Sequence, residues 1–151
     1  DELHDEGVAR NVAVSNFTVD LLEEAREILD APIVANQVEM HPLLPPREEM
    51  VEYCDDHDIE LVAYSPLCRG AALELPEVQA VAEKHGVSPA RTCLAWLFSK
   101  GLNAIPKAVG EDHIRDNYAA LELELDPEDV ERIDSVEERK RRFDDPQAPW
   151  H

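Results

Sequence analysis

The sequence predicts an α/β protein made of four successive βα units around a parallel sheet. Short apolar runs and longer amphipathic stretches alternate four times along the chain, which is typical of strands that are each followed by a covering helix. The 151 residues, 44% of them hydrophobic, are enough for one ordinary domain with a buried core. Four βα units are half of an eight-unit barrel, which typically needs ~250 residues. We therefore expect a partial (β/α)8 TIM barrel of four βα units, followed by a C-terminal helix and a tail.

The predicted elements follow one another in regular order. We expect strands at 11–17, 33–40, 60–67 and 103–109, and helices at about 19–30, 47–57, 76–85, 89–100, 112–121 and 127–142. Thr18 and Ser88 are placed to cap the helices that they precede. Gly86 can end a helix in a left-handed turn, and Asp126 followed by a proline opens the last helix.

The two ends of the chain are less regular. The first ten residues, "DELHDEGVAR", indicate the end of a helix that stops at Gly7, and this start suggests a piece of something longer. The last eleven, "RRFDDPQAPWH", are expected to be irregular, with Phe143 and Trp150 as docking points. A half barrel leaves two open sheet edges and an uncovered apolar interior. We therefore expect the chain alone to associate or to remain loosely packed.

The chain is strongly acidic. Its 34 acidic and 14 basic residues give a formal charge of −20, which repels nucleic acid and anionic membrane surfaces. The acids stand among apolar residues throughout, as on helices with solvated acidic faces. One hypothesis is adaptation to high salt, where counterions screen this repulsion; unfolding midpoints that fall as salt rises would contradict it. The alternative is an ordinary acidic cytosolic protein.

The cysteines and the hydropathy pattern indicate a cytoplasmic protein without a metal. Cys54, Cys68 and Cys93 are widely spaced and form neither a disulfide framework nor a zinc pattern. No apolar run reaches the ~18 residues that span a bilayer, and no stretch has the basic start and apolar middle that are expected of a signal peptide. The six histidines lack metal-binding spacing, and His41 is expected to pack beside Pro42 rather than to bind metal.

Each predicted strand ends on polar side chains. In order they are Ser15 and Asn16, then Gln37, Glu39 and His41, then Tyr64 and Ser65, and finally Lys107. Each alone has an ordinary structural explanation, as a turn, a buried amide, a core ring or a surface lysine. Ligands of barrels and α/β sheets bind beyond the carboxyl ends of the strands. Together these groups suit a ligand that has both a ring and a phosphate.

Four ordered motifs carry a family resemblance. The segments "VAVSNF", "ANQVEMHPLLPP", "LVAYSPLCRG" and "AIPKAVGEDHIRDN" resemble the second half of the aldo-keto reductases, strands five to eight. That family is an eight-stranded barrel that binds a nicotinamide cofactor, usually NADPH, and reduces carbonyls to alcohols by hydride transfer. The resemblance implies that residues 1–151 are the C-terminal half of such a barrel domain. It also implies NADP(H) as the cofactor, with NAD(H) as the alternative, and a small carbonyl compound as the substrate of the full-length enzyme.

The resemblance also implies roles for individual residues. Ser15, Asn16 and Gln37 would hold the nicotinamide carboxamide, which fixes the ring face that presents the hydride. Tyr64 would stack on the ring. The groups implied at the phosphates and the adenine are Ser65 and Leu67 along the pyrophosphate, Lys107 and His113 at the ribose phosphate, and Asp116 and Asn117 at the adenine.

Two departures from the family pattern limit these expectations. Ala108 and Gly110 replace hydroxyl residues, and His113 replaces the arginine that commonly grips the ribose phosphate, which leaves the choice between NADP and NAD open. In the family the acid tyrosine and its partners come from the first four strands. Tyr53, Tyr64 and Tyr118, the last expected to pack on a helix, are not suitable proton donors. We therefore expect no catalytic residue here and an inactive chain; the alternative is a non-catalytic nucleotide-binding or interaction half-barrel.

Overall fold

The computed structural model describes residues 1–143, which form two compact units. The N-terminal unit comprises Asp1–Val38 and Pro46–Val62, and the C-terminal unit comprises Glu39–Pro45 and Ala63–Phe143. Trp150, predicted as a docking point, lies outside the described residues. No helix within residues 1–143 is long and apolar enough to cross a membrane.

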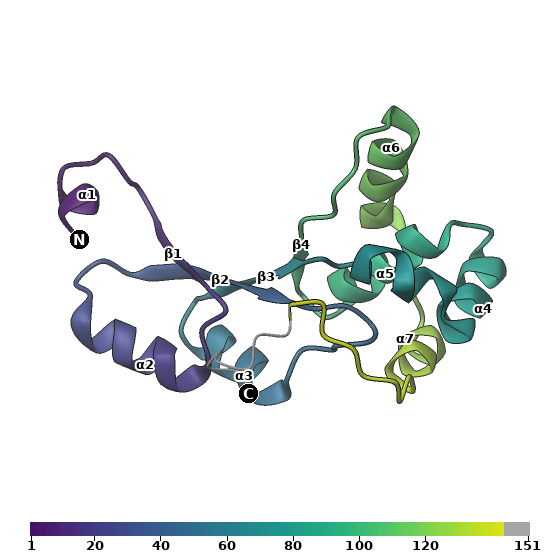
Figure 1. Ribbon diagram of the computed structural model, residues 1–151, viewed down its shortest axis with the longest axis horizontal. Coiled ribbons are helices and arrows are strands. Elements are labelled where there is room, and N and C mark those ends of the chain that lie inside the picture. The colour runs from purple at the N-terminus through teal and green to yellow at the C-terminus, as the bar shows by residue number, and fades with distance from the viewer. Residues whose placement is uncertain (144–151) are drawn as a thin grey trace. The chain divides into compact units, whose positions relative to one another are not determined.

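The strands form a four-stranded parallel sheet in the order β1-β2-β3-β4 (Figure 1). They are β1 (Val12–Ser15), β2 (Ile33–Glu39), β3 (Glu60–Tyr64) and β4 (Asn103–Ala104). The pairing of β1 with β2 is parallel and places Ser15 opposite Gln37. The predicted α/β class and the four strands in sequence order are confirmed.

All four strands end before the residue that the sequence predicts, and the difference is largest for β3 and β4. β3 stops at Tyr64 because Ser65 adopts a left-handed φ of 49°, which breaks the extended chain. β4 was expected to reach residue 109, but it covers only Asn103–Ala104. The amide of Ile105 still donates to the carbonyl of Ala63 at 3.0 Å. Pro106 has no N–H to continue the ladder, so residues 105–110 run on as an irregular segment.

The N-terminal unit packs two helices on one face of its strands. Its helices are α1 (Glu2–Asp5), α2 (Val19–Ile28) and α3 (Glu48–Asp56). Figure 1 shows α2 and α3 side by side below β1 and β2. Thr18 caps α2 as predicted, since its hydroxyl accepts from the Leu21 amide at 3.4 Å. Leu22 and Cys54 are fully buried in this layer, whereas Ala13 and Ser15 of β1 point to the exposed side.

The C-terminal unit is mainly helical. Its elements are the 3-10 helix η1 (Cys68–Glu74), α4 (Pro76–His85), α5 (Pro89–Ser99), α6 (Glu111–Ala119), the 3-10 helix η2 (Ala120–Glu122) and α7 (Pro127–Asp134). The central helix α5 buries Trp96, Leu94 and Leu97 completely and contacts α4, α6 and α7. The predicted caps are confirmed: Gly86 ends α4 with a φ of 64°, and Ser88 accepts from the Arg91 amide at 3.0 Å.

The last helix is shorter than the prediction. Helix α7 begins as expected, with a capping box between Asp126 and Asp129, but it ends at Asp134 rather than near residue 142. Beyond it, the amides of Lys140, Arg142 and Phe143 donate to acceptors about a hundred residues away, the Leu43 carbonyl and the Glu39 carboxylate. These backbone groups therefore cannot form the local bonds that a helix needs.

A buried aspartate fastens α7 to α4. Asp129 is only 2% exposed, and its carboxylate accepts from Lys84 Nζ at 2.7 Å and from His85 Nε2 at 2.6 Å. Burial would raise the pKa of Asp129, but the hydrogen bonds from Lys84, from His85 and from the Asp126 amide outweigh burial and lower that pKa below its ordinary value of 3.8. Asp129 therefore stabilises the fold as an ionised group.

Replacing Asp129 by Asn should destabilise the protein. The change removes a charge whose partners remain in place, so the free energy of unfolding should fall by about 2–4 kcal/mol, measured by urea denaturation at pH 7. Because the folded pKa lies below 3.8, the stabilisation is present above that pH and is lost as pH falls through the folded value. The gap between wild type and Asp129→Asn should therefore shrink in acid. The exposed Glu128→Gln is the control, and a gap that widens in acid would contradict the assignment.

Candidate functional site

The first part of the candidate site lies where β1 and β2 end. Ser15 Oγ and the Asn16 amide both donate to the Gln37 carbonyl, each at 2.9 Å. Asn16 has a φ of 60°, a left-handed conformation that asparagine tolerates better than most residues. The side-chain amide of Gln37 makes no hydrogen bond within residues 1–143. The structure thus brings together the three residues predicted to hold a carboxamide, with one amide available to pair.

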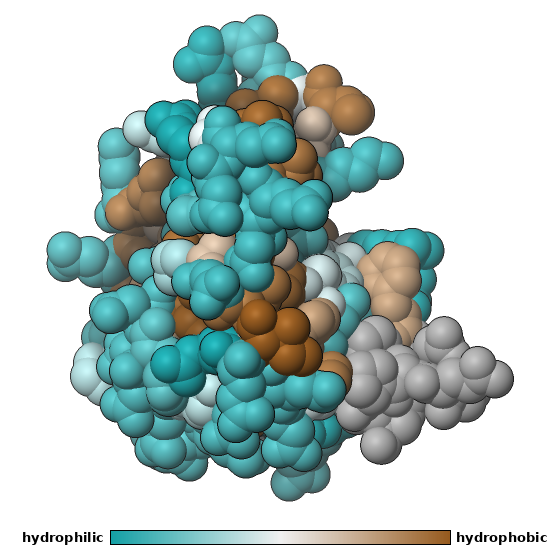
Figure 2. Space-filling model, turned by 90° about the vertical axis from the view of Figure 1, so that its left-hand side faces the viewer, coloured by the Kyte–Doolittle hydropathy of each residue, from teal (hydrophilic) through white to brown (hydrophobic). Residues whose placement is uncertain are grey.

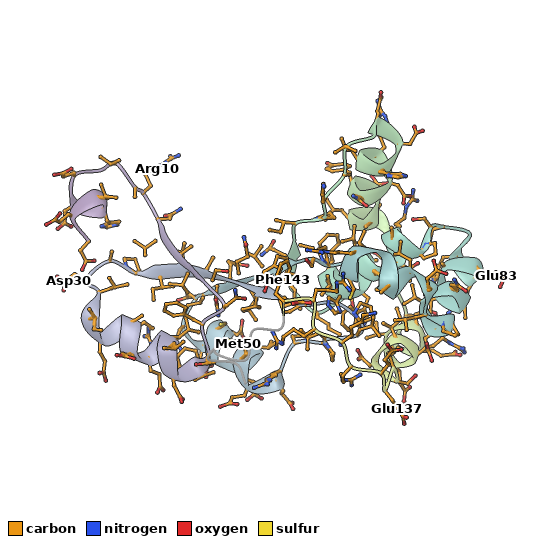
Figure 3. The ribbon with its side chains drawn as sticks, in the orientation of Figure 1. Arg10, Asp30, Met50, Glu83, Glu137 and Phe143 are labelled. Atoms are coloured by element: carbon orange, nitrogen blue, oxygen red, sulfur yellow. The ribbon has the colours of Figure 1, made fainter. Side chains whose placement is uncertain are left out.

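Asn36, which was not predicted from the sequence, supports this strand end. Its side chain is completely buried, its Oδ1 accepts from the Phe17 amide at 3.3 Å, and its Nδ2 donates to the Phe17 carbonyl at 3.0 Å. Nδ2 also lies 3.7 Å from the sulfur of Met50, which Figure 3 labels. The Asn36 side chain therefore pairs with both backbone groups of Phe17, as a neighbouring strand would, and holds the turn at Ser15 and Asn16. The sequence pointed only to the neighbouring Gln37. The burial of Asn36 and its hydrogen-bond partners have no signal in the residues around it.

Replacing Asn36 by Ala should loosen this turn. Both backbone groups of Phe17 would lose their partner, so we expect a loss of about 1–3 kcal/mol in the free energy of unfolding. Amide hydrogen exchange should accelerate most at Asn16 and Phe17. Asn11→Ala, at an exposed position of the same unit, should leave both measurements unchanged. Unchanged exchange at Phe17 in Asn36→Ala would show that the side chain does not hold the turn.

The second part of the candidate site follows β3 in the C-terminal unit. Residues 65–70 form a tight loop in which Ser65, Cys68, Arg69 and Gly70 all have positive φ. The Cys68 amide donates to the Ser65 carbonyl and the Gly70 amide to the Leu67 carbonyl, both at 2.8 Å. Tyr64, half-buried at the start of the loop, meets the ring of Phe143 edge-on with the centroids 5.4 Å apart. The predicted residues Tyr64, Ser65 and Leu67 therefore lie on one rigid loop.

Lys107 lies in the exposed segment 105–110, next to the end of β3. The bond from the Ile105 amide to the Ala63 carbonyl brings this segment alongside Tyr64. Lys84 pairs with two aspartates and Lys100 with one. Lys107, by contrast, has no ion pair or hydrogen bond with any residue in the range 1–143. An unpaired ammonium group in a chain with 34 acidic residues is available to an anion.

Three predicted residues, His113 at the ribose phosphate and Asp116 and Asn117 at the adenine, lie on α6, and they differ in how firmly they are held. Asp116 accepts from Arg91 Nε at 3.0 Å and from Arg91 Nη2 at 2.7 Å, and it also accepts from the Ser88 hydroxyl. This carboxylate therefore fastens α6 to the start of α5. His113 is exposed and Asn117 is half-buried. Arg115 donates from Nε and Nη2 to Oε1 of Glu111 and does not replace the arginine missing at position 113.

A buried Glu39–His41 pair was placed at a strand end by the sequence but was given no role. His41 Nε2 lies 3.0 Å from Glu39 Oε1, and both side chains are fully buried. Burial lowers the pKa of His41, although Glu39 opposes this shift, so the ring is neutral and donates through Nε2. Glu39 also accepts from the amides of Arg142 and Phe143, at 2.6 and 3.1 Å. His41 Nδ1 and Arg142 Nε are buried without a partner in the described part of the chain.

The other cysteines and tyrosines of residues 1–143 lie in varied surroundings. Burial raises the pKa of Cys54 to about 11 and that of Cys93 to about 12, so these thiols remain protonated at neutral pH. Tyr53 accepts from Arg26 at 3.1 Å and stacks on His57. Tyr118, expected to pack on a helix, is instead 70% exposed, because α6 has no neighbour on that side in the C-terminal unit. No group of three potential metal ligands occurs in these residues.

This fold and these strand ends correspond to a known class of enzymes. The sequence model of the Aldo/keto reductase family matches residues 1–138, so the chain belongs to that family. The resemblance drawn from the four motifs is confirmed, as is the interpretation of the fold as part of a (β/α)8 barrel.

The similar proteins are reductases about twice as long. Glyoxal reductase of Bacillus subtilis is 36% identical over 141 residues, which are 93% of this chain and 51% of that protein. Methylglyoxal reductase DkgB of Escherichia coli O157:H7 is 34% identical over 90% of this chain and 51% of its own length. Among solved structures, the aldo-keto reductase MGS-M4 from a deep-sea metagenome superposes with a TM-score of 0.87 at 31% identity, over 95% of this chain and 53% of that one. The chain therefore spans about half the length of the curated relatives it matches.

Proposed function

We propose that this chain supplies the dinucleotide-binding half of an NAD(P)H-dependent carbonyl reductase. The observation that carries the proposal is Gln37, whose backbone carbonyl pairs with Ser15 and Asn16 across two parallel strands and whose side-chain amide has no hydrogen-bond partner in the described residues. A primary amide is complementary to the carboxamide of nicotinamide, since each offers one acceptor and a pair of donor hydrogens. Membership of the aldo/keto reductase family supports the same assignment.

The residues of each unit suit different parts of the cofactor. When bound, a nicotinamide cofactor supplies the hydride that reduces a carbonyl. In the N-terminal unit, Gln37 and Asn16 would orient the carboxamide and so select the ring face. In the C-terminal unit, Tyr64 would pack on the ring, Ser65 and Leu67 would line the pyrophosphate, and Lys107 would neutralise a phosphate. The N-terminal end of α6, which follows directly, favours an anion placed near it.

The proposal is tested by removing the Gln37 amide. Gln37→Ala should weaken binding of both NADH and NADPH about tenfold, because the carboxamide is common to the two, measured by quenching of cofactor fluorescence. Gln79→Ala, an exposed glutamine of α4 whose side chain donates only to the Leu73 carbonyl, is the matched control. Equal affinity of Gln37→Ala and wild type would contradict the carboxamide assignment. A wild-type chain that binds neither cofactor would reject the proposed function as a whole.

The choice between NADPH and NADH should depend on Lys107 and His113. Lys107→Met should reduce NADPH affinity more than NADH affinity, whereas Lys107→Arg should keep most of the difference. His113→Arg adds a bidentate phosphate donor and should raise the NADPH to NADH preference about tenfold. Arg10→Met, at an exposed position of the N-terminal unit labelled in Figure 3, controls for the charge change. A preference that no Lys107 or His113 variant moves would show that the phosphate binds elsewhere.

We further propose that the whole protein reduces small aldehydes or ketones and that this chain alone is inactive. The names of two relatives, a glyoxal reductase and a methylglyoxal reductase, support a small carbonyl substrate. None of Tyr53, Tyr64 and Tyr118 is placed to give a proton to a carbonyl oxygen, a step that reduction requires. Oxidation of NADPH by methylglyoxal in the presence of the 151-residue chain alone would contradict the second statement.

A second candidate function, an interaction half-barrel, is favoured by one surface. Ile114, Tyr118 and Leu121 follow one another at helical spacing along α6 and η2 and are 53%, 70% and 61% exposed. Figure 2 shows apolar surface among hydrophilic side chains at the top of the view, the level at which Figure 1 draws α6. Apolar surface of this kind is typical of a docking face. Self-association of a chain that binds neither nucleotide would favour this candidate over the first.

A further inference from the structure

We propose that Glu39 is a positioning residue of the cofactor site, because it anchors a C-terminal strap, residues 140–143, whose last ring sets the plane of Tyr64. The inference rests on the proposed function only for the role of Tyr64 as the ring that packs on nicotinamide. The anchor and the ring contact are properties of the C-terminal unit itself.

The anchor is a buried charge satisfied by backbone. The Glu39 side chain is fully buried, and its carboxylate accepts three hydrogen bonds, from Arg142 N at 2.6 Å, His41 Nε2 at 3.0 Å and Phe143 N at 3.1 Å. The Lys140 amide adds a fourth fixed point by donating to the Leu43 carbonyl at 2.9 Å. A carboxylate without these donors would be costly to bury. The strap is therefore held in one path although residues 137–143 form neither helix nor strand.

The strap ends at an aromatic contact with the proposed nicotinamide ring partner. Phe143, labelled in Figure 3, meets Tyr64 edge-on at 5.4 Å with 74° between the ring planes. The Arg69 guanidinium lies 5.3 Å from the centroid of the Phe143 ring. Phe143 is thus held between the Arg69 guanidinium and the ring of Tyr64. Since stacking on a planar ligand needs a fixed ring plane, a restrained Tyr64 is ready to bind without losing further rotational freedom.

The anchor and the ring can be separated by two variants. Glu39→Gln keeps the shape of the side chain but gives the amides of Arg142 and Phe143 only one acceptor oxygen. Phe143→Ala removes the ring and leaves both backbone donors in place. Glu83→Gln makes the same change from carboxylate to carboxamide at an exposed position of α4 and is the matched control for Glu39→Gln. The test uses the complete 151-residue chain.

Trypsin measures release of the strap, because four cleavage sites, residues 139–142, lie in it or next to it. Loss of charged hydrogen bonds should speed cleavage there about ten- to a hundredfold in Glu39→Gln, with no change in Phe143→Ala or Glu83→Gln. Tyr64 is followed by ¹⁹F NMR of the 3-fluorotyrosine-labelled chain, with the signal assigned by Tyr64→Phe. In Glu39→Gln and Phe143→Ala the Tyr64 signal should move toward that of the exposed Tyr118. The Tyr53 signal should remain unchanged.

Cofactor affinity then decides whether this positioning serves the site. Both variants should weaken NADPH binding about tenfold, and Phe143→Ala should do so with its strap still protected from trypsin. An unmoved Tyr64 signal in both variants, or wild-type NADPH affinity in Phe143→Ala, would overturn the inference. If the wild-type chain binds no dinucleotide, the proposed function fails, while the fluorine signal of Tyr64 still decides whether Glu39 positions that ring. Should Glu39→Gln not fold, Phe143→Ala alone supports or overturns the contact between the two rings.

Discussion

The burial of the Glu39 carboxylate is the constraint on which the C-terminal unit depends most. A carboxylate that is excluded from water must be surrounded by donors, and here two of its three donors are backbone amides from the other end of the chain. Those amides are consequently lost to any helix, so α7, which ends at Asp134, cannot continue to residue 142 as its periodicity predicts. The neutral His41 completes the set without adding a second buried charge. One side chain at the end of β2 thus determines the path of the last described residues.

In the N-terminal unit, buried polar groups are likewise paired, but here the partners are neutral. The Gln37 carbonyl accepts two donors from the turn after β1, and the Asn36 amide satisfies both backbone groups of Phe17. Polar backbone at the end of this sheet is therefore paired internally. The side-chain amide of Gln37 has no hydrogen bond with residues 1–143, and the proposed contact with the cofactor carboxamide rests on this group.

Local signals predicted the features that depend on neighbouring residues. The alternation of strands and helices, the caps at Thr18 and Ser88 and the left-handed end at Gly86 were each correct, because a few adjacent residues determine them. The early ends of β3 and β4 were missed although Ser65 and Pro106 act locally, whereas the other errors concern distant partners. Helical periodicity after residue 134 gave no sign of the Glu39 carboxylate, and the exposure of Tyr118 depends on what packs beside α6.

Within the candidate site, too, some residues could be predicted from the sequence and others could not. Ser15, Asn16 and Gln37 could be grouped in advance, since parallel strands bring their carboxyl ends to one edge. The roles of Asn36 and Glu39 could not be predicted, because a buried polar residue is recognised only by its partners. Family membership and the free groups at Gln37 and Lys107 therefore carry the functional proposal together.

The central claim, that this chain holds a dinucleotide site at its strand ends, is tested most directly by titrating the ¹⁵N-labelled chain with NADPH and following its amide signals. The account predicts saturable shifts concentrated at residues 15–17, 36–37, 64–70 and 105–113, with little change on α2 and α4. Shifts that are absent at saturating NADPH, or that are confined to other surfaces, would contradict it.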